Sequence, residues 1–181
     1  MTGKSILLMV LLVGMPARCH AQNRPKSQPA ELDVLKSYVG TWDADIEVWP
    51  QGPDATSIKL KGVEKNRAYG KYWLASDLDS QFMGQTMKVH SIVGFDVDQK
   101  QLVGKVIDDG MYAAKMVGRY DPQSKIVHWT TTVKNASGEP LVQKTTISHK
   151  NPGERLLVLS VPGKKNKPFT KFMQIKFTKR K

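Results

Sequence analysis

The sequence contains one cysteine, Cys19, among its 181 residues. A single cysteine cannot form an intrachain disulfide, and it cannot supply a zinc site built from several thiolates. The chain also lacks the roughly 20 consecutive apolar residues that a membrane-spanning helix requires. Acidic residues are scarce, with 16 Asp and Glu against 28 Lys and Arg, which gives a formal net charge of +12. These absences exclude a disulfide scaffold and a multi-span membrane protein.

Familiar catalytic motifs are absent as well. There is no Gly-x-Ser-x-Gly elbow, no Walker loop, no dinucleotide-binding glycine fingerprint and no His-Glu-x-x-His motif. The histidines beyond residue 21, His90, His128 and His149, lack the close spacing of metal ligands. We therefore expect no metal site and no cofactor, and the sequence favours a protein that is not an enzyme. A hydrolase or isomerase that uses Asp108 and a histidine is the enzymatic alternative.

The first 21 residues have the pattern of a cleaved signal peptide. Lys4 supplies a positive start, and an apolar run of the length typical of signal peptides follows at Ile6 to Met15. Small residues precede a cleavage site that we expect after Ala21. A lipid-anchored Cys19 is the alternative, but Arg18 stands where a lipid-attachment motif has a small residue. We expect a secreted or periplasmic protein with no transmembrane segment after removal of the signal.

The rest of the chain begins with one helical pattern and then changes period. Residues 22–29 are polar and contain two prolines, which predicts a flexible lead-in. Leu32, Leu35 and Val39 then share a helical face, and Gly40 is suited to end the helix. From Trp42 onward, apolar and polar residues alternate in short segments bounded by Gly, Pro, Asp or Asn. This alternation predicts half-buried β-strands.

About ten such segments follow one another at intervals of roughly ten residues, as in antiparallel sandwiches and barrels. No second helical pattern separates them, so a parallel sheet is not expected. Closure of a sheet removes its exposed edges. We therefore predict an all-β protein, an antiparallel up-and-down barrel of about 8–10 strands with one short N-terminal helix. Residues 30–181 would form this single domain.

Several segments carry a resemblance to known families. The helix that runs into Gly40-Thr41-Trp42 resembles the opening of lipocalin-like domains. The chain also resembles a bacterial secreted family, domain of unknown function 1579, in an ordered set of short segments at residues 70–74, 82–85, 94–96, 106–108, 118–121 and 172–181. It departs from that family at Val106-Ile107-Asp108, where the family has Trp-x-Asp, and near Leu159, where the family has an acidic residue. The resemblance implies a calycin-like barrel and export, and it assigns no catalytic residue.

The interior of such a barrel could hold a ligand. We expect the large apolar side chains at inward positions to contact it, together with an acid at the end of a strand, where a barrel mouth places ligand contacts. These residues are Trp42, Trp73, Phe95, Trp129, Met173 and Asp108. The hypothesis is a carrier of a small apolar or amphiphilic molecule. In the alternative, these side chains fill the core and leave no cavity.

The C-terminal segment supports a different hypothesis. Residues 162–181 contain no acid, and their basic residues include Lys164, Lys165, Lys167, Lys179, Arg180 and Lys181. A positive cluster attracts anionic surfaces. The alternative function is therefore a non-enzymatic protein of the cell envelope that contacts an anionic polymer or lipid. These lysines could equally be ordinary solvated side chains, and export argues against a nucleic-acid partner.

Overall fold

The computed structural model describes residues 28–82, 84–110, 113–134, 137–163 and 168–181. The predicted signal peptide at 1–21 lies outside these residues, as does nearly all of the predicted lead-in at 22–29. Lys164, Lys165 and Lys167 also lie outside them.

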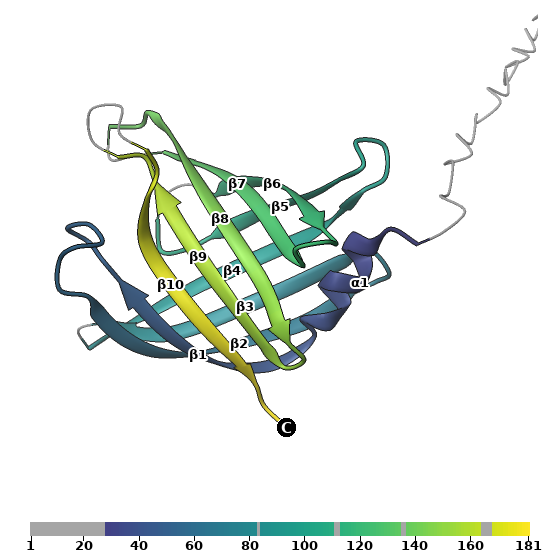
Figure 1. Ribbon diagram of the computed structural model, residues 1–181, viewed down its shortest axis with the longest axis horizontal. Helices are drawn as coiled ribbons and strands as arrows, with labels where there is room; N and C mark the ends of the chain where they lie inside the picture. The colour runs from purple at the N-terminus through teal and green to yellow at the C-terminus, as the bar shows by residue number, and fades with distance from the viewer. Residues whose placement is uncertain (1–27, 83, 111–112, 135–136, 164–167) are drawn as a thin grey trace, which may run out of the picture.

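The described chain forms one helix and ten strands (Figure 1). The helix is α1 (Ala30–Ser37). The strands are β1 (Gly40–Val48), β2 (Ile58–Tyr69), β3 (Trp73–Phe82), β4 (Gln85–Asp96), β5 (Gln101–Ile107), β6 (Ala114–Asp121), β7 (Ile126–Lys134), β8 (Pro140–Asn151), β9 (Glu154–Val161) and β10 (Thr170–Lys179). Each strand pairs antiparallel with the next, and β1 pairs with β10 to close the barrel. The predicted antiparallel up-and-down barrel is confirmed.

Alternation along the strands directs apolar side chains inward. In β1, Trp42, Ala44 and Ile46 are buried, whereas Asp43 and Asp45 between them are exposed. Successive side chains of a strand point to opposite faces of the sheet, so this pattern needs one dry face and one wet face. The closed barrel provides both, and each strand pairs with a neighbour on either side.

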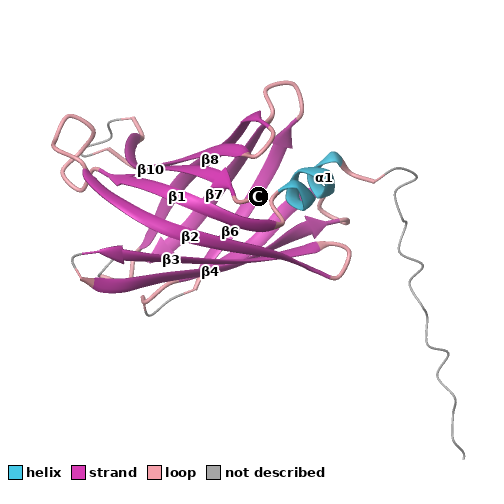
Figure 2. Cartoon of the chain, turned by 90° about the horizontal axis from the view of Figure 1, so that it is seen from below, coloured by secondary structure: helices cyan, strands magenta, loops and turns pink. Residues whose placement is uncertain are grey.

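The two ends of the barrel differ. At the closed end, α1 packs against β3, β4 and β6, and its Leu32, Val34 and Leu35 join the apolar core (Figure 2). The chain also finishes at this end, where the Arg180 N–H donates to the Thr41 carbonyl at 2.9 Å. The opposite, open end carries the connections β1–β2, β3–β4, β5–β6, β7–β8 and β9–β10.

Apolar side chains of helix α1 pack into the core at this end of the barrel, so shortening one of them should weaken the whole fold. Leu35 is 3% exposed. The substitution L35A should lower the free energy of unfolding by about 2–5 kcal/mol, the usual cost of truncating a buried leucine. Urea denaturation measures this. K36A, at the exposed neighbouring position, should change stability by less than about 0.5 kcal/mol. Equal effects of the two changes would show that α1 does not seal the barrel.

Candidate ligand-binding cavity

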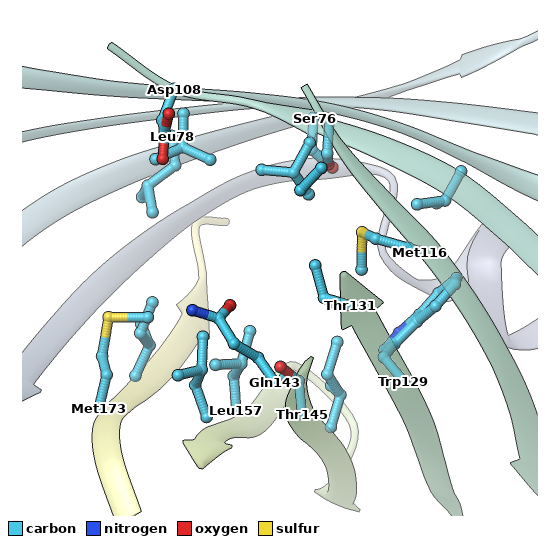
Figure 3. Close-up of a pocket in the computed structure, with 18 of the residues that line it drawn as sticks. Ser76, Leu78, Asp108, Met116, Trp129, Thr131, Gln143, Thr145, Leu157 and Met173 are labelled. Atoms are coloured by element: carbon cyan, nitrogen blue, oxygen red, sulfur yellow. The ribbon is translucent and has the colours of Figure 1, made fainter. Parts of the chain in front are cut away.

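The barrel encloses a cavity of about 500 Å³. Tyr38 and Arg155 line it at the closed end, and Asp108 and Gly110 line it at the open end. Its volume lies within the range of about 300–1,000 Å³ that small-molecule sites occupy. Much of the wall is aliphatic side chains and methionines, including Leu78, Leu157 and Met116 (Figure 3). The barrel interior is therefore not filled by its own side chains.

Five of the six residues predicted as ligand contacts are placed inside the barrel or at its mouth. Trp129, Met173 and Asp108 line the cavity (Figure 3). Trp42 and Phe95 are 3% and 8% exposed, and they belong to the packed core rather than to the cavity wall. Contact between any of these residues and a ligand stays a prediction.

Trp73 lies on the outside of the barrel, so its predicted inward position is wrong. The side chain is 42% exposed and faces a shallow outer groove with Tyr69 and Ile92. The cause is the register of β3, in which the inward positions begin at Leu74, 2% exposed. The Trp73 ring lies against its cross-strand partner Gly94, where a Cβ atom would come within 2.4 Å of the ring. Glycine at position 94 therefore leaves room for this ring.

A buried ion pair lines the closed end of the cavity. Arg155 from β9 pairs with Glu64 from β2, and their side chains are 3% and 11% exposed. The carboxylate also accepts a hydrogen bond of 2.5 Å from Asn66 Nδ2. Ser76 Oγ in turn donates to Asn66 Oδ1. Hydrogen bonds of this kind offset part of the cost of removing both charges from water.

The guanidinium of Arg155 is surrounded by aromatic rings. Its Cζ atom lies 4.7 Å from the centre of the Tyr38 ring, 4.5 Å from that of Trp42 and 4.0 Å from that of Phe177. The electron-rich ring faces attract a cation and replace some of its lost hydration. Burial lowers the pKa of Arg155 to about 10, so the side chain stays cationic at neutral pH.

Tyr38 links helix α1 to this region. Its hydroxyl and His149 Nε2 are 2.8 Å apart, and the two rings stack with centres separated by 5.0 Å. The indole nitrogen of Trp42 donates to the Tyr38 carbonyl at 2.6 Å. Burial raises the pKa of Tyr38 and lowers the pKa of His149. Both shifts favour a neutral pair in which the tyrosine hydroxyl donates to the imidazole.

Sequence reasoning missed Glu64 and Arg155. Charged residues in strands normally face water, so neither residue was singled out from the sequence. The sequence did contain one indication that Glu64 faces inward. Glu64 continues the series of alternate positions that includes Leu60 and Gly62. That series places it on the same face as the apolar residues.

The cavity also holds polar groups that are not charged. The side chains of Thr131, Gln143 and Thr145 project from β7 and β8 into the cavity (Figure 3). Thr131 and Thr145 are 6% and 7% exposed, and both line the cavity. One wall therefore offers neutral donors and acceptors to a ligand.

The histidines and Asp108 are not brought together. Asp108 Oδ1 accepts a hydrogen bond from the Gly110 N–H at 2.8 Å, in a turn at the open end. His149 stacks on Tyr38 at the closed end, and His90 pairs with Asp77 on the outer face at 2.6 Å. His128 is exposed. The described residues thus contain no Asp108–histidine pair of the kind that the enzymatic hypothesis requires, and they contain no cluster able to hold a metal.

Three of the six basic residues predicted to contact an anionic partner, Lys179, Arg180 and Lys181, belong to the described chain. Lys179 and Arg180 lie at the closed end, at the finish of β10. Arg180 pairs with Asp43 at 2.6 Å, and Lys179 Nζ lies 5.2 Å from the Trp42 ring centre. Lys164, Lys165 and Lys167 lie outside the described residues. Binding of an anionic polymer or lipid by the C-terminal segment stays a prediction.

Residues 28–179 match the family model described as a protein of unknown function, DUF1579. The match covers most of the chain, and the chain therefore belongs to this family, as its sequence segments predicted. None of the curated proteins compared with the chain matches it.

Solved structures show the same fold. The protein Rv2717c from M. tuberculosis superposes with a TM-score of 0.61 at 11% identity, over 86% of this chain and 100% of its own. The S-type phycobiliprotein lyase CPES from Guillardia theta superposes with a TM-score of 0.56 at 8% identity, over 85% of this chain and 94% of its own. At such low identity the likeness establishes the fold alone. It confirms the predicted lipocalin-like barrel. Among the described residues, no helix has the length and apolar character needed to span a membrane.

The Arg155–Glu64 pair should behave as a unit in stability measurements. R155M should lower the free energy of unfolding by about 3–5 kcal/mol, because it leaves the Glu64 charge buried without its partner. The double variant R155M/E64L removes both charges and should recover most of that loss. A double-mutant cycle in urea tests this. Losses that simply add would contradict a direct interaction between the two side chains.

His149 should make the fold sensitive to mild acid. Its folded pKa lies below the unfolded value of about 6.5, so the unfolded chain binds the proton more readily. The contribution of His149 to stability is complete above that pH and is lost as the pH falls through 6.5 towards the folded pKa. Unfolding free energies measured from pH 8 to pH 5 should therefore fall less steeply for H149Q than for the wild type. H128Q, on the exposed face, should keep the wild-type slope. A wild-type slope in H149Q would show that His149 is not buried as a neutral ring.

Proposed function

We propose that the protein binds a small apolar or amphiphilic molecule inside the barrel. The observation that carries this proposal is the cavity of about 500 Å³, which runs from Arg155 at the closed end to Asp108 at the open end. Protein interiors are normally packed with few voids larger than a water molecule. An interior space of this size is therefore the default candidate for a ligand site.

The wall chemistry supports an amphiphile. Aliphatic and methionine side chains from several strands bury apolar surface and adapt to an irregular shape. Trp129 adds a large ring to the same wall. Transfer of an apolar chain from water into such a space is favourable in proportion to the area buried. The threonines of β7 and β8 would bind the polar part of the molecule.

Export is part of the same proposal. The first 21 residues have the pattern of a signal peptide. We place the protein outside the cytoplasm, where a barrel without disulfides depends on packing for its stability. Release of the N-terminal segment on secretion, measured as the mass of the mature chain, tests this separately. A full-length mass in the cell extract would contradict it.

Native mass spectrometry of the protein isolated from its own cells is the direct test of ligand binding. We expect an added mass that is constant between preparations and that disappears on unfolding. Repeated detection of the bare chain, together with no uptake of apolar probes by the purified protein, would contradict the proposal.

A cavity-filling variant tests the position of the ligand. Val133 lines the cavity, and its neighbour Thr132 is exposed on the outer face of β7. V133W should weaken probe binding by about tenfold or more because it occupies the space, at a stability cost of about 1–3 kcal/mol. T132W introduces the same ring on the other face and should leave binding unchanged. Equal binding by both variants, measured by titration calorimetry with 1-decanol, would place the ligand elsewhere.

A further inference from the structure

We propose that the cavity is selective for uncharged amphiphiles and that Glu64 is the residue that sets this selectivity by neutralising Arg155. This inference rests on the proposed function, since it describes which polar group the ligand carries. It concerns a ligand with an apolar body and a neutral polar group, such as a hydroxyl or an amide, rather than a carboxylate or an ammonium.

Among the described residues, the charges that line the cavity balance. They are Glu64, Asp108, Lys134 and Arg155, two acids and two bases. Of these, Arg155 is the cation at the closed end, and it is already paired with Glu64. An anionic group brought to this end would lose its hydration and would have to compete with the Glu64 carboxylate for the guanidinium. A cationic group would compete with Arg155 in the same way.

The pairing is held in place from both sides. Asn66 donates to the Glu64 carboxylate, and the Tyr38 and Phe177 rings lie on the guanidinium. Neither partner can turn away to meet a charged ligand without breaking these contacts. The carboxylate therefore stays on Arg155 when a ligand enters, and the closed end presents no net charge.

The polar groups left for a ligand are uncharged. Thr131 and Thr145 line the cavity, and each carries a neutral hydroxyl that can donate or accept a hydrogen bond. Arg155 Nε is buried and lacks a hydrogen-bond partner among the described residues. A hydroxyl or amide satisfies such groups without carrying a charge out of water.

The selectivity for uncharged ligands can be tested on the wild-type protein, without any substitution. Titration calorimetry at neutral pH compares 1-decanol, decanamide, decanoate and decylammonium, which share one chain length. Decanoate is ionised there, since carboxyl groups titrate near pH 4–5. We expect the two neutral probes to bind about tenfold tighter or more than the two charged ones. Decanoate binding as tightly as decanol would overturn the selectivity and leave the proposed function standing. Failure of all four probes to bind would overturn the proposed function itself.

Glu64 is tested by E64Q, which keeps the shape of the side chain and exposes the Arg155 charge. This variant should bind decanoate about tenfold tighter than the wild type does, with little change for decanol. D45N removes one acid from an exposed ion pair with Lys61 on the outer face and is the matched control. D45N should retain the wild-type preference. An unchanged preference in E64Q would refute the role of Glu64.

A second variant keeps the proposal testable if E64Q does not fold. T145V removes one hydroxyl from the wall and keeps its shape. It should weaken decanol binding by about three- to tenfold, the loss of one hydrogen bond. It should not improve decanoate binding, because no charge has changed. Unaltered decanol affinity would show that the neutral polar group does not bind at this wall.

Discussion

The interior of the barrel depends on one buried charge. Arg155 lies among the rings of Tyr38, Trp42 and Phe177 and is neutralised by Glu64 on the opposite side of the β1–β10 seam. A cation in this position is unfavourable unless an opposite charge accompanies it. The pair therefore links three parts of the fold, namely helix α1 through Tyr38, the first two strands and the last two. The neutral closed end of the cavity is a consequence of the same contact.

Much of the fold could be predicted because, along most strands, side chains alternate between the inside and the outside of the barrel. In β4, Val89, Ser91 and Val93 occupy alternate positions, and all three line the cavity. The rule fails where an aromatic residue is taken as evidence of burial in itself. Trp73 lies on the outer face at the start of its strand. Its orientation follows from the register of β3 against β4, in which Trp73 is opposite Gly94. Register is set by pairing between strands, which the sequence of a single strand does not contain.

The candidate site was harder to predict than the fold. Trp129 and Met173 were predicted as cavity residues because they are large apolar side chains at inward strand positions. Asp108 was predicted because it is an acid at the end of a strand. Glu64 and Arg155 were not found, because each looks like a solvated side chain until its partner is placed opposite. The two residues are far apart in sequence, and closure of the barrel brings them together. Chemistry that depends on such a pairing is visible only in three dimensions.

The position of the two chain ends has a consequence for how the protein can be presented to its surroundings. Helix α1 and the end of β10 both lie at the closed end, and Lys179 N–H donates to the Gly153 carbonyl there at 2.9 Å. Anything joined to either end of the folded domain, whether a tether, a label or a solid support, is therefore attached at the far side from the mouth. The barrel can be anchored by either terminus while its entrance still faces the solution.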